Sequence, residues 1–402
     1  MRKRLFIYFG FFCIAVSCVW AGGWNNTLMG CRALGLGAAF VGVADDPSAI
    51  FYNPAGLTLQ KENLNFSVDG FYVMPTHEYV MPTGTKAESH YNNTIPQIFV
   101  SYKASDRLTL GIGAYIPYAG GGVDWKENQI GFPFKSYLAV YTITPSLAYM
   151  VNEKFSVGFN LNFYRSILSV KTIGETFGPL EAEENGSALS AGIGLMYQPT
   201  ERFRIGLSAR GPAKMNLNGT TTISTIAPEF GTVKIKLDSE TSFKLPWDFE
   251  FGFSYKITPN FLWASSAQYT MWSSLDKIEK TIENLPFIGD FKQIEIMGFE
   301  NILIFRTGVE YIVTSGLSLR GGIGYDRSAV PDKTLSFNNI DVDKLSFLGG
   351  IGYHAGNMKI DFVYIYAQGQ ERERTRTEFG LPLTERFNLS ASILGLGVTF
   401  SF

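Results

Sequence analysis

The sequence has 402 residues and a formal net charge of −2, with 34 Lys and Arg against 36 Asp and Glu. A mildly acidic chain without a long basic run is a poor match for a nucleic-acid-binding protein. Beyond the N-terminus, no stretch approaches the roughly 18 uninterrupted apolar residues of a membrane-spanning helix. Aromatic residues nevertheless make up 15% of the chain, charged residues only 17%, and 42 residues are glycine. This composition favours a surface that faces lipid without helical spans.

The N-terminus has the pattern of a secretory signal. A basic stretch at residues 2–4 precedes an apolar run at residues 5–20. The run is short for a spanning helix, which needs about 20 residues, so we predict that residues 1–21 are a cleaved signal peptide. A retained anchor and lipid modification of Cys18 are the alternatives. Cleavage leaves Cys31 as the only cysteine, which excludes an intramolecular disulfide and a cysteine-based zinc site.

The next segment, residues 22–62, does not alternate as a strand would. Asp46 is suited to cap a helix and Pro47 to be its first residue, which predicts a short helix that runs to Phe51 or Tyr52. Pro54 then ends it, because the residue before a proline avoids the helical region. Short helices and turns ahead of the strands predict a plug inserted into a barrel.

From about residue 63 the sequence alternates. In residues 155–163 every odd position is apolar and every even position is Ser, Gly or Asn, and residues 394–402 behave similarly. Successive side chains of a strand point to opposite faces, so these segments predict strands with one apolar face. A soluble β-sandwich would also alternate, but its strands are typically about 5–6 residues long. A tilted membrane strand needs about 9–11.

The connections between strands follow a rhythm. Fourteen strand candidates lie at residues 63–74, 94–104, 107–117, 136–151, 153–170, 186–199, 202–217, 246–257, 260–272, 301–313, 316–327, 344–355, 357–370 and 388–402. Short joints with turn residues alternate with long connections at residues 75–93, 118–135, 171–185, 218–245, 273–300, 328–343 and 371–387. This alternation is typical of periplasmic turns and extracellular loops. We therefore predict an all-β fold, a 14-stranded antiparallel transmembrane barrel over residues 63–402, which is too wide for its own side chains to fill.

The third candidate strand is interrupted. Residues 108–116 are followed by Pro117 and by the run Gly120, Gly121 and Gly122. Proline cannot donate to a ladder and glycine packs poorly, so such a run ends pairing or makes a bulge. The strand either ends there in an extracellular loop or bends and opens the wall.

No chemistry for catalysis is apparent. The three histidines, His77, His90 and His354, do not share one segment and have no catalytic spacing. His77 and His90 fall in the first long loop and His354 at a short turn. We expect no enzyme activity, no metal and no cofactor.

The C-terminus ends on Phe402, with apolar residues at alternate positions before it. This resembles the signature by which outer-membrane barrels are assembled. We expect the barrel assembly machinery as a partner through Phe402, outer-membrane lipid around the wall, and a monomer.

Several separated motifs resemble the FadL/TodX-type family of outer-membrane transporters for long-chain fatty acids and hydrocarbons. They are residues 44–48, Asn53-Pro54-Ala55, residues 269–273, Phe305-Arg306-Thr307-Gly308, Leu319-Arg320-Gly321-Gly322 and residues 326–332. The resemblance covers nearly the whole mature chain in order. It implies a plugged barrel in the bacterial outer membrane that captures a hydrophobic molecule outside and releases it sideways through a gap at the third strand.

The resemblance also implies functional residues. The plug and gate would comprise Asp45, Asp46, Asn53, Pro54 and Ala55, and the lateral opening Pro117, Gly120, Gly121 and Gly122.

The ligand contacts are less well defined by the resemblance. The family holds a carboxylate with basic side chains. Lys171 and Lys292 lie near such positions, and Phe287 and Phe291 are candidates for an apolar capture groove. Long-chain fatty acid is the first substrate expected. An uncharged or aromatic hydrocarbon, a general diffusion porin and a surface adhesin remain alternatives.

Overall fold

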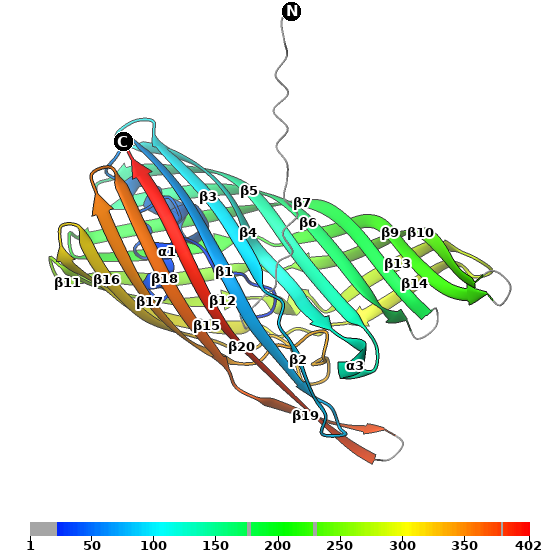
Figure 1. Cartoon of the computed structure of the whole chain (residues 1–402). Helices are drawn as coiled ribbons and strands as arrows, with labels where there is room; N and C mark the ends of the chain where they lie inside the picture. Colours follow the sequence, from blue (N-terminus) through cyan, green and yellow to red (C-terminus); the bar gives the residue numbers. More distant parts are fainter. Residues whose placement is uncertain (1–21, 175–177, 228–230, 379–380) are drawn as a thin grey trace, which may run out of the picture.

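A computed structural model describes residues 22–174, 178–227, 231–378 and 381–402. The predicted signal peptide lies outside the described residues. The chain forms a closed antiparallel β-barrel whose strands run obliquely around a hollow interior (Figure 1).

The wall has 14 strands, so the predicted fold class is confirmed. In order around the barrel they are β1 (Leu64–Val80), β3 (Asn93–Lys103), β4 (Leu108–Trp125), β5 (Phe134–Asn152), β6 (Phe155–Gly174), β7 (Gly178–Thr200), β8 (Phe203–Arg210), β11 (Asp248–Thr258), β12 (Phe261–Thr270), β15 (Ile302–Thr314), β16 (Leu317–Asp326), β17 (Lys344–Ala355), β18 (Met358–Gly369) and β20 (Leu381–Ser401). Pairing of β1 with β20, from Asn65↔Ser401 to Val80↔Arg386, closes the ring. Closure leaves no edge strand exposed to lipid.

The two ends of the barrel differ. Short turns and the C-terminus lie at one end, and longer hairpins extend the wall at the other (Figure 1). The extensions are β2 (Lys86–Ser89), β9 (Ala213–Ala227), β10 (Gly231–Leu245), β13 (Lys277–Leu285), β14 (Gly289–Ile296) and β19 (Arg372–Glu378), with α3 (Glu127–Ile130) and η2 (Trp272–Ser274) between strands. Several strands continue beyond their predicted ends. His77, which the sequence placed in a loop, is therefore a buried residue of β1.

The alternating pattern puts apolar side chains on the outside. In β6, Phe159 and Phe163 are each 49% exposed, whereas Asn160 and Asn162 between them point inward and are buried. An outward apolar band with a polar interior is what a barrel in lipid requires.

Residues 22–62 lie within the barrel and contain α1 (Cys31–Gly35), α2 (Ala49–Tyr52) and the 3₁₀ helix η1 (Pro54–Leu59) (Figure 1). No helix among the described residues is long and apolar enough to cross a membrane.

The start of α2 differs from the sequence prediction. Ser48 is its N-cap, and Asp46 instead accepts hydrogen bonds from the backbone N and Oγ of Ser48, at 2.9 and 2.6 Å. Asp46 thus shapes the turn that precedes the helix. The helix ends at Tyr52, as predicted.

The plug packs so tightly that the wall needs glycine where the two backbones meet. A side chain at Gly206 of β8 would overlap the carbonyl oxygen of Val41, and one at Gly308 of β15 would overlap that of Leu36. Residues of α1, α2 and η1 consequently share one apolar core with the inward side chains of the barrel.

Candidate functional site

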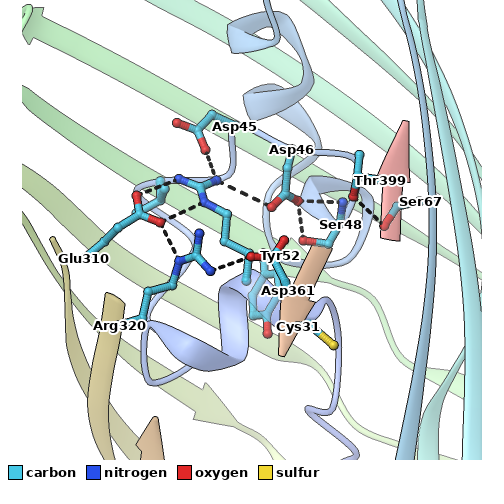
Figure 2. A network of polar contacts seen from close by, with 12 residues as sticks. Cys31, Asp45, Asp46, Ser48, Tyr52, Ser67, Glu310, Arg320, Asp361 and Thr399 are labelled. Carbon is cyan, nitrogen blue, oxygen red and sulfur yellow. Dashed lines mark hydrogen bonds and ion pairs between the residues drawn. The ribbon is translucent and has the colours of Figure 1, made fainter. Parts of the chain in front are cut away.

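An ion-pair network fastens the plug to the wall (Figure 2). Arg32 of α1 contacts Asp45 at 2.6 Å and Asp46 at 3.5 Å within the plug. It also makes two hydrogen bonds to Glu310 of β15, at 3.1 and 3.2 Å. Arg204 of β8 contacts the second oxygen of Asp45 at 3.1 Å. The plug segment at residues 32–46 is therefore held from two sides of the barrel.

Charge in this network is balanced along the wall as well. Arg320 of β16 bridges Glu310 and Asp361 of β18, with both contacts at 2.5 Å. Arg32 contacts three carboxylates, Arg320 two and Arg204 one, so every carboxylate of the cluster has an arginine partner. This is the condition for keeping ionised groups in a largely buried place.

The two plug carboxylates respond oppositely to their surroundings. Burial alone would raise the pKa of Asp45, but Arg32 and Arg204 hold it well below its usual range. Burial raises the pKa of Asp46, which Arg32 and Ser48 only partly offset. Asp45 is thus the firmly ionised anchor of the pair.

The predicted gate residues Asn53, Pro54 and Ala55 face a different part of the wall from the glycine run. The Asn53 side chain donates to the carbonyl oxygens of Val41 and of Leu195 in β7, both at 3.0 Å. It accepts from Ala55 N at 3.2 Å and so begins η1. Side chains added at Gly194 and Gly158 would strike Pro54 and Ala55. The triplet therefore packs against β6, β7 and β8.

The ladder between β3 and β4 stops partway along. Its register runs from Lys103↔Thr109 to Ile98↔Ala114 and goes no further among the described residues. β4 continues to Trp125 on its other neighbour, β5, with two bulges, between Tyr115 and Tyr118 and between Gly121 and Val123. Pro117 and Gly122 fall in these bulges, and Gly122 has a φ of +68°. The bent part of β4 thus separates from β3.

Residues 24–26, at the start of the plug, pair with the edge of β4 beyond the point where its ladder with β3 ends. The N–H of Asn26 donates to the Pro117 carbonyl and the N–H of Ala119 to the Trp24 carbonyl, both at 2.9 Å. Asn25 and Tyr118 form an isolated antiparallel bridge between these bonds. Residues 24–26 therefore act as a short substitute strand.

Gly120 lies directly against the Trp24 ring, since a Cβ there would lie 2.8 Å from it. Trp24 packs edge-on against Phe243, Trp272 and Phe299, with ring centroids 5.3 to 6.2 Å apart. Gly121 pairs with Tyr137 of β5 through the backbone. This aromatic cluster lies directly inside the bent strand.

A cavity of about 540 Å³ opens above Trp24, between the wall and the long hairpins. Mostly apolar side chains line it, including Trp24, Leu138, Leu168, Phe243, Ile278 and Ile282, with Lys280 and Glu295 at its polar side. Its volume lies in the range of ligand pockets, about 300–1,000 Å³.

The predicted ligand contacts are not among the residues that line this cavity. Phe287 is fully exposed at the tip between β13 and β14, and Lys292 is exposed on β14. Phe291 is half-buried beside Lys292. Lys171 forms an ion pair with Glu181 and lines a separate hollow of about 680 Å³. The structure does not bring these four residues together.

Sequence reasoning missed Arg210, the last residue of β8. Its Nη2 donates to the Phe51 carbonyl at 3.0 Å, and its guanidinium lies 4.4 Å from the centre of the Phe51 ring. Nη1 is 3.6 Å from Asp248. The signal available in the sequence is an arginine on the inward face of a strand that Gly211 and Pro212 interrupt.

Comparisons with known proteins agree with this architecture. The family described as outer membrane protein transport protein (OMPP1/FadL/TodX) matches residues 13–402. The 47 kDa outer membrane protein of Pasteurella multocida is 26% identical, with 92% of each chain covered. The long-chain fatty acid transport protein of Escherichia coli K12 is 22% identical, covering 79% of this chain and 82% of the relative.

Solved structures share the fold. A FadL homologue of Pseudomonas aeruginosa superposes with a TM-score of 0.77 at 16% identity, over 96% of this chain and all of the other. The toluene transporter TodX of Pseudomonas putida gives a TM-score of 0.76 at 15% identity, over 96% of this chain and 99% of the other. At this level of identity the likeness concerns the fold alone.

Proposed function

The chain belongs to the OMPP1/FadL/TodX family of outer-membrane transporters for hydrophobic molecules, and from this premise we propose that it takes up long-chain fatty acids by capture outside and lateral release. The barrel lies in the bacterial outer membrane, as its relatives do. The family consists of transporters rather than enzymes.

The observation that carries the proposal is the interrupted ladder between β3 and β4. A molecule that leaves between these strands enters lipid directly and never crosses the polar interior of the barrel. Pairing ends at Ile98↔Ala114, and the only backbone partner of β4 near Pro117 and Ala119 within the described residues, apart from β5, is the plug segment 24–26. Movement of three plug residues would thus open the wall at Pro117, Gly120, Gly121 and Gly122.

The cavity above Trp24 supports capture. Residues of the long β13–β14 hairpin line it, and so do Trp24 and Gly120, where the substitute strand begins. We propose that Phe287, Phe291 and Lys292 on the β13–β14 hairpin, together with Lys171, contact the ligand as it arrives. Residues 22–62 act as the plug in this scheme, and residues 1–21 are removed as the signal peptide.

Asp45 and Asp46 contact Arg32 within the plug, and Asp45 also contacts Arg204 of β8. Asn53, Pro54 and Ala55 pack against β6, β7 and β8. We propose that these contacts stay in place during transport while residues 24–26 move. The exposed C-terminal Phe402 is proposed as the contact for the barrel assembly machinery, and the barrel as a monomer.

The substrate class rests on two kinds of relative. The Escherichia coli relative is named for long-chain fatty acids and is similar over most of this chain. Toluene transporters share the fold, so an uncharged aromatic hydrocarbon is the alternative cargo of the same route.

Uptake of radiolabelled oleate by a host that lacks its own transporter tests the proposal. The informative variant is Gly122→Val, since a φ of +68° disfavours any β-branched residue and the change disturbs the bulge. Gly84→Val is the matched control, because Gly84 has a φ of +85° in open space at a hairpin tip. We expect Gly122→Val to lower uptake by roughly tenfold at equal surface levels, and Gly84→Val to leave it unchanged. Equal uptake by both variants would refute the lateral route, and no uptake by the wild type would refute the substrate class.

A further inference from the structure

The wall of the cavity above Trp24 contains a buried carboxylate among its apolar side chains. Glu184 of β7 pairs with Leu168 of β6, and Leu168 lines the cavity. Leu180, four residues earlier in β7, lines the cavity as well. Residues an even number apart in a strand share one face, so Glu184 points to the cavity side of the wall. Its side chain is fully buried.

Glu184 is only partly satisfied by its neighbours. Its Oε1 accepts a hydrogen bond from Ser239 Oγ of β10 at 2.6 Å, and Lys280 Nζ of β13 lies 3.4 Å from the same oxygen. Gly219 of β9 pairs with both Glu184 and Ser239 and has no side chain, which lets Ser239 reach across. Oε2 has no hydrogen-bond partner among the described residues. An unmet acceptor on a buried carboxylate is costly.

Thr241 provides a second unmet group, two residues along β10 from Ser239. It is 3% exposed and lines the cavity, and its Oγ1 has no hydrogen-bond partner among the described residues. Thr241 is directly opposite Lys280 in the ladder between β10 and β13, and Lys280 also lines the cavity. The large majority of buried polar side-chain atoms in folded proteins are paired. These two atoms beside one lysine therefore indicate a partner from outside the chain.

The charges at this place disfavour an ionic head group of either sign. Lys280 is the only cation among the described residues that line the cavity, and Glu295 of β14 lines it too. A carboxylate would therefore be repelled by Glu184 and Glu295, whereas an ammonium group would meet Lys280 before it reached Glu184. A hydroxyl group is neutral and both donates and accepts hydrogen bonds, so it is complementary to the unmet atoms.

We propose that Glu184, Lys280 and Thr241 bind the hydroxyl group of a neutral long-chain molecule, such as an alcohol, whose chain lies in the cavity above Trp24. The hydroxyl donates to Glu184 Oε2 and accepts from Lys280 Nζ, which has three N–H donors, with Thr241 Oγ1 as a further partner. This site rests on the proposed function, because it requires capture in the same cavity. It goes beyond that function by adding neutral hydroxylated molecules to the cargo.

Equilibrium binding to the full mature chain, held in amphipol, tests the site with three probes: 1-tetradecanol, its methyl ether and myristate. The ether can accept a hydrogen bond but cannot donate one. We expect the wild type to bind tetradecanol about tenfold more tightly than the ether, because only the alcohol can donate to a charged acceptor.

The informative variant is Glu184→Gln, which keeps the shape of the side chain and removes its charge. It should reduce the preference for tetradecanol over the ether to about twofold. It should also strengthen myristate binding several-fold, because Lys280 then faces the cavity without Glu184 beside it. A purely structural role of Glu184 would weaken all three probes alike. Glu240→Gln is the matched control, since Glu240 is an exposed residue on the opposite face of β10, and it should change no affinity.

A second variant tests the site without altering any charge. Thr241→Val removes a hydroxyl that has no partner in the described structure. It should migrate as a folded barrel in unheated gels, with undiminished thermal stability, yet bind tetradecanol several-fold more weakly. Thr281→Val is its control, because Thr281 follows Lys280 in β13 and points to the other face.

The outcomes separate the site from the proposed function. The hydroxyl site is refuted if the wild type binds tetradecanol and the ether equally, or if Glu184→Gln weakens all three probes by the same factor. Binding of myristate by the wild type would then leave the proposed function standing. If the wild type binds none of the three probes, capture in this cavity fails together with the site.

Discussion

Arg32 of the plug and Glu310 of β15 form a two-point ion pair, with Nε 3.1 Å from Oε2 and Nη2 3.2 Å from Oε1 (Figure 2). Their side chains are 20% and 10% exposed. The pair joins residues 278 positions apart in the chain, and it links α1 of the plug to the barrel wall through two hydrogen bonds. Its geometry fixes the orientation of α1 as well as its position, because a bidentate contact constrains the guanidinium plane.

Breaking this pair should loosen the plug without unfolding the wall. Arg32→Gln leaves Glu310 and Asp45 with less compensation, and removal of one partner of a buried pair costs about 3–5 kcal/mol. Partial exposure of the pair reduces this cost. We therefore expect the docked plug to lose about 2 kcal/mol of stability, which corresponds to roughly 30-fold faster amide exchange in residues 24–62. Lys86→Gln, at an exposed pair with Glu78, is the control. Hydrogen-exchange mass spectrometry that finds the same protection in Arg32→Gln and the wild type would contradict the assignment.

Close contact between the plug and β15 predicts a strong effect of one methyl group. Gly308→Ala places a Cβ against the Leu36 carbonyl, and overpacking of this kind typically costs about 1–3 kcal/mol. Gly349→Ala is the matched control, because nothing lies within 4 Å of a Cβ there. Protease cleavage within residues 24–62 should become faster in the first variant only. Equal cleavage rates in the two variants would show that the plug can shift at no cost.

The two plug carboxylates should differ in their dependence on pH. Arg32 and Arg204 hold the pKa of Asp45 well below the usual range of an aspartate, so its charge stabilises the docked plug above that range and the contribution disappears as the pH falls further. Burial raises the pKa of Asp46, so its charge opposes docking at neutral pH. We expect Asp45→Asn to lower plug protection at pH 7, by about 1–2 kcal/mol, and Asp46→Asn to leave it unchanged or raise it. A larger loss in Asp46→Asn than in Asp45→Asn would reverse the roles.

The strands of the wall were predictable because each has a local signature. The alternation in residues 155–163 reflects only which side chains face lipid. It does not depend on which strands lie next to this one, so it can be read from the sequence alone. The ends of strands were not predictable in the same way. β1 continues through His77 to Val80 because its partner β20 continues beside it. The residues near His77 carry no pattern that would indicate this pairing with a segment about 300 residues later.

The site was harder to predict for the same physical reason. The glycine run at Gly120–Gly122 announced an irregular strand, but the bond between Asn26 and Pro117 joins two segments with no sequence relation. The Asn53 triplet was assigned to the plug and gate from its resemblance, but only the structure shows that it packs against β7 and β8. Arg210 became visible only when folding placed it against Phe51 of α2 and Asp248 of β11.

A reversible cross-link should show whether residues 24–26 must move. Asn25 and Tyr118 are directly opposite one another, where Cβ atoms are about 4.5–5.5 Å apart, close to disulfide geometry. The variant with Asn25→Cys and Tyr118→Cys should take up oleate roughly tenfold more slowly when it is oxidised than after reduction. Comparing the two redox states of one protein cancels any loss from the missing tyrosine. Asn25→Cys alone is the control and should not respond to reductant. Full uptake by the cross-linked form would mean that the exit lies elsewhere.

Permeation of a polar solute separates a plugged transporter from a general diffusion porin. Fourteen strands enclose a lumen too wide for wall side chains to fill, and here the side chains of α1, α2 and η1 occupy it as part of one buried core. Liposomes that contain the intact barrel should therefore not swell in arabinose. Deletion of residues 22–62 should produce swelling at a rate typical of an open pore, provided that the deleted form still migrates as a folded barrel before heating. The combined change Arg32→Gln and Gly308→Ala keeps the plug in the chain and should give an intermediate rate. Brisk swelling with the intact protein would favour the porin. It would show that polar solutes can pass the plug even though the backbone of the plug contacts the wall directly.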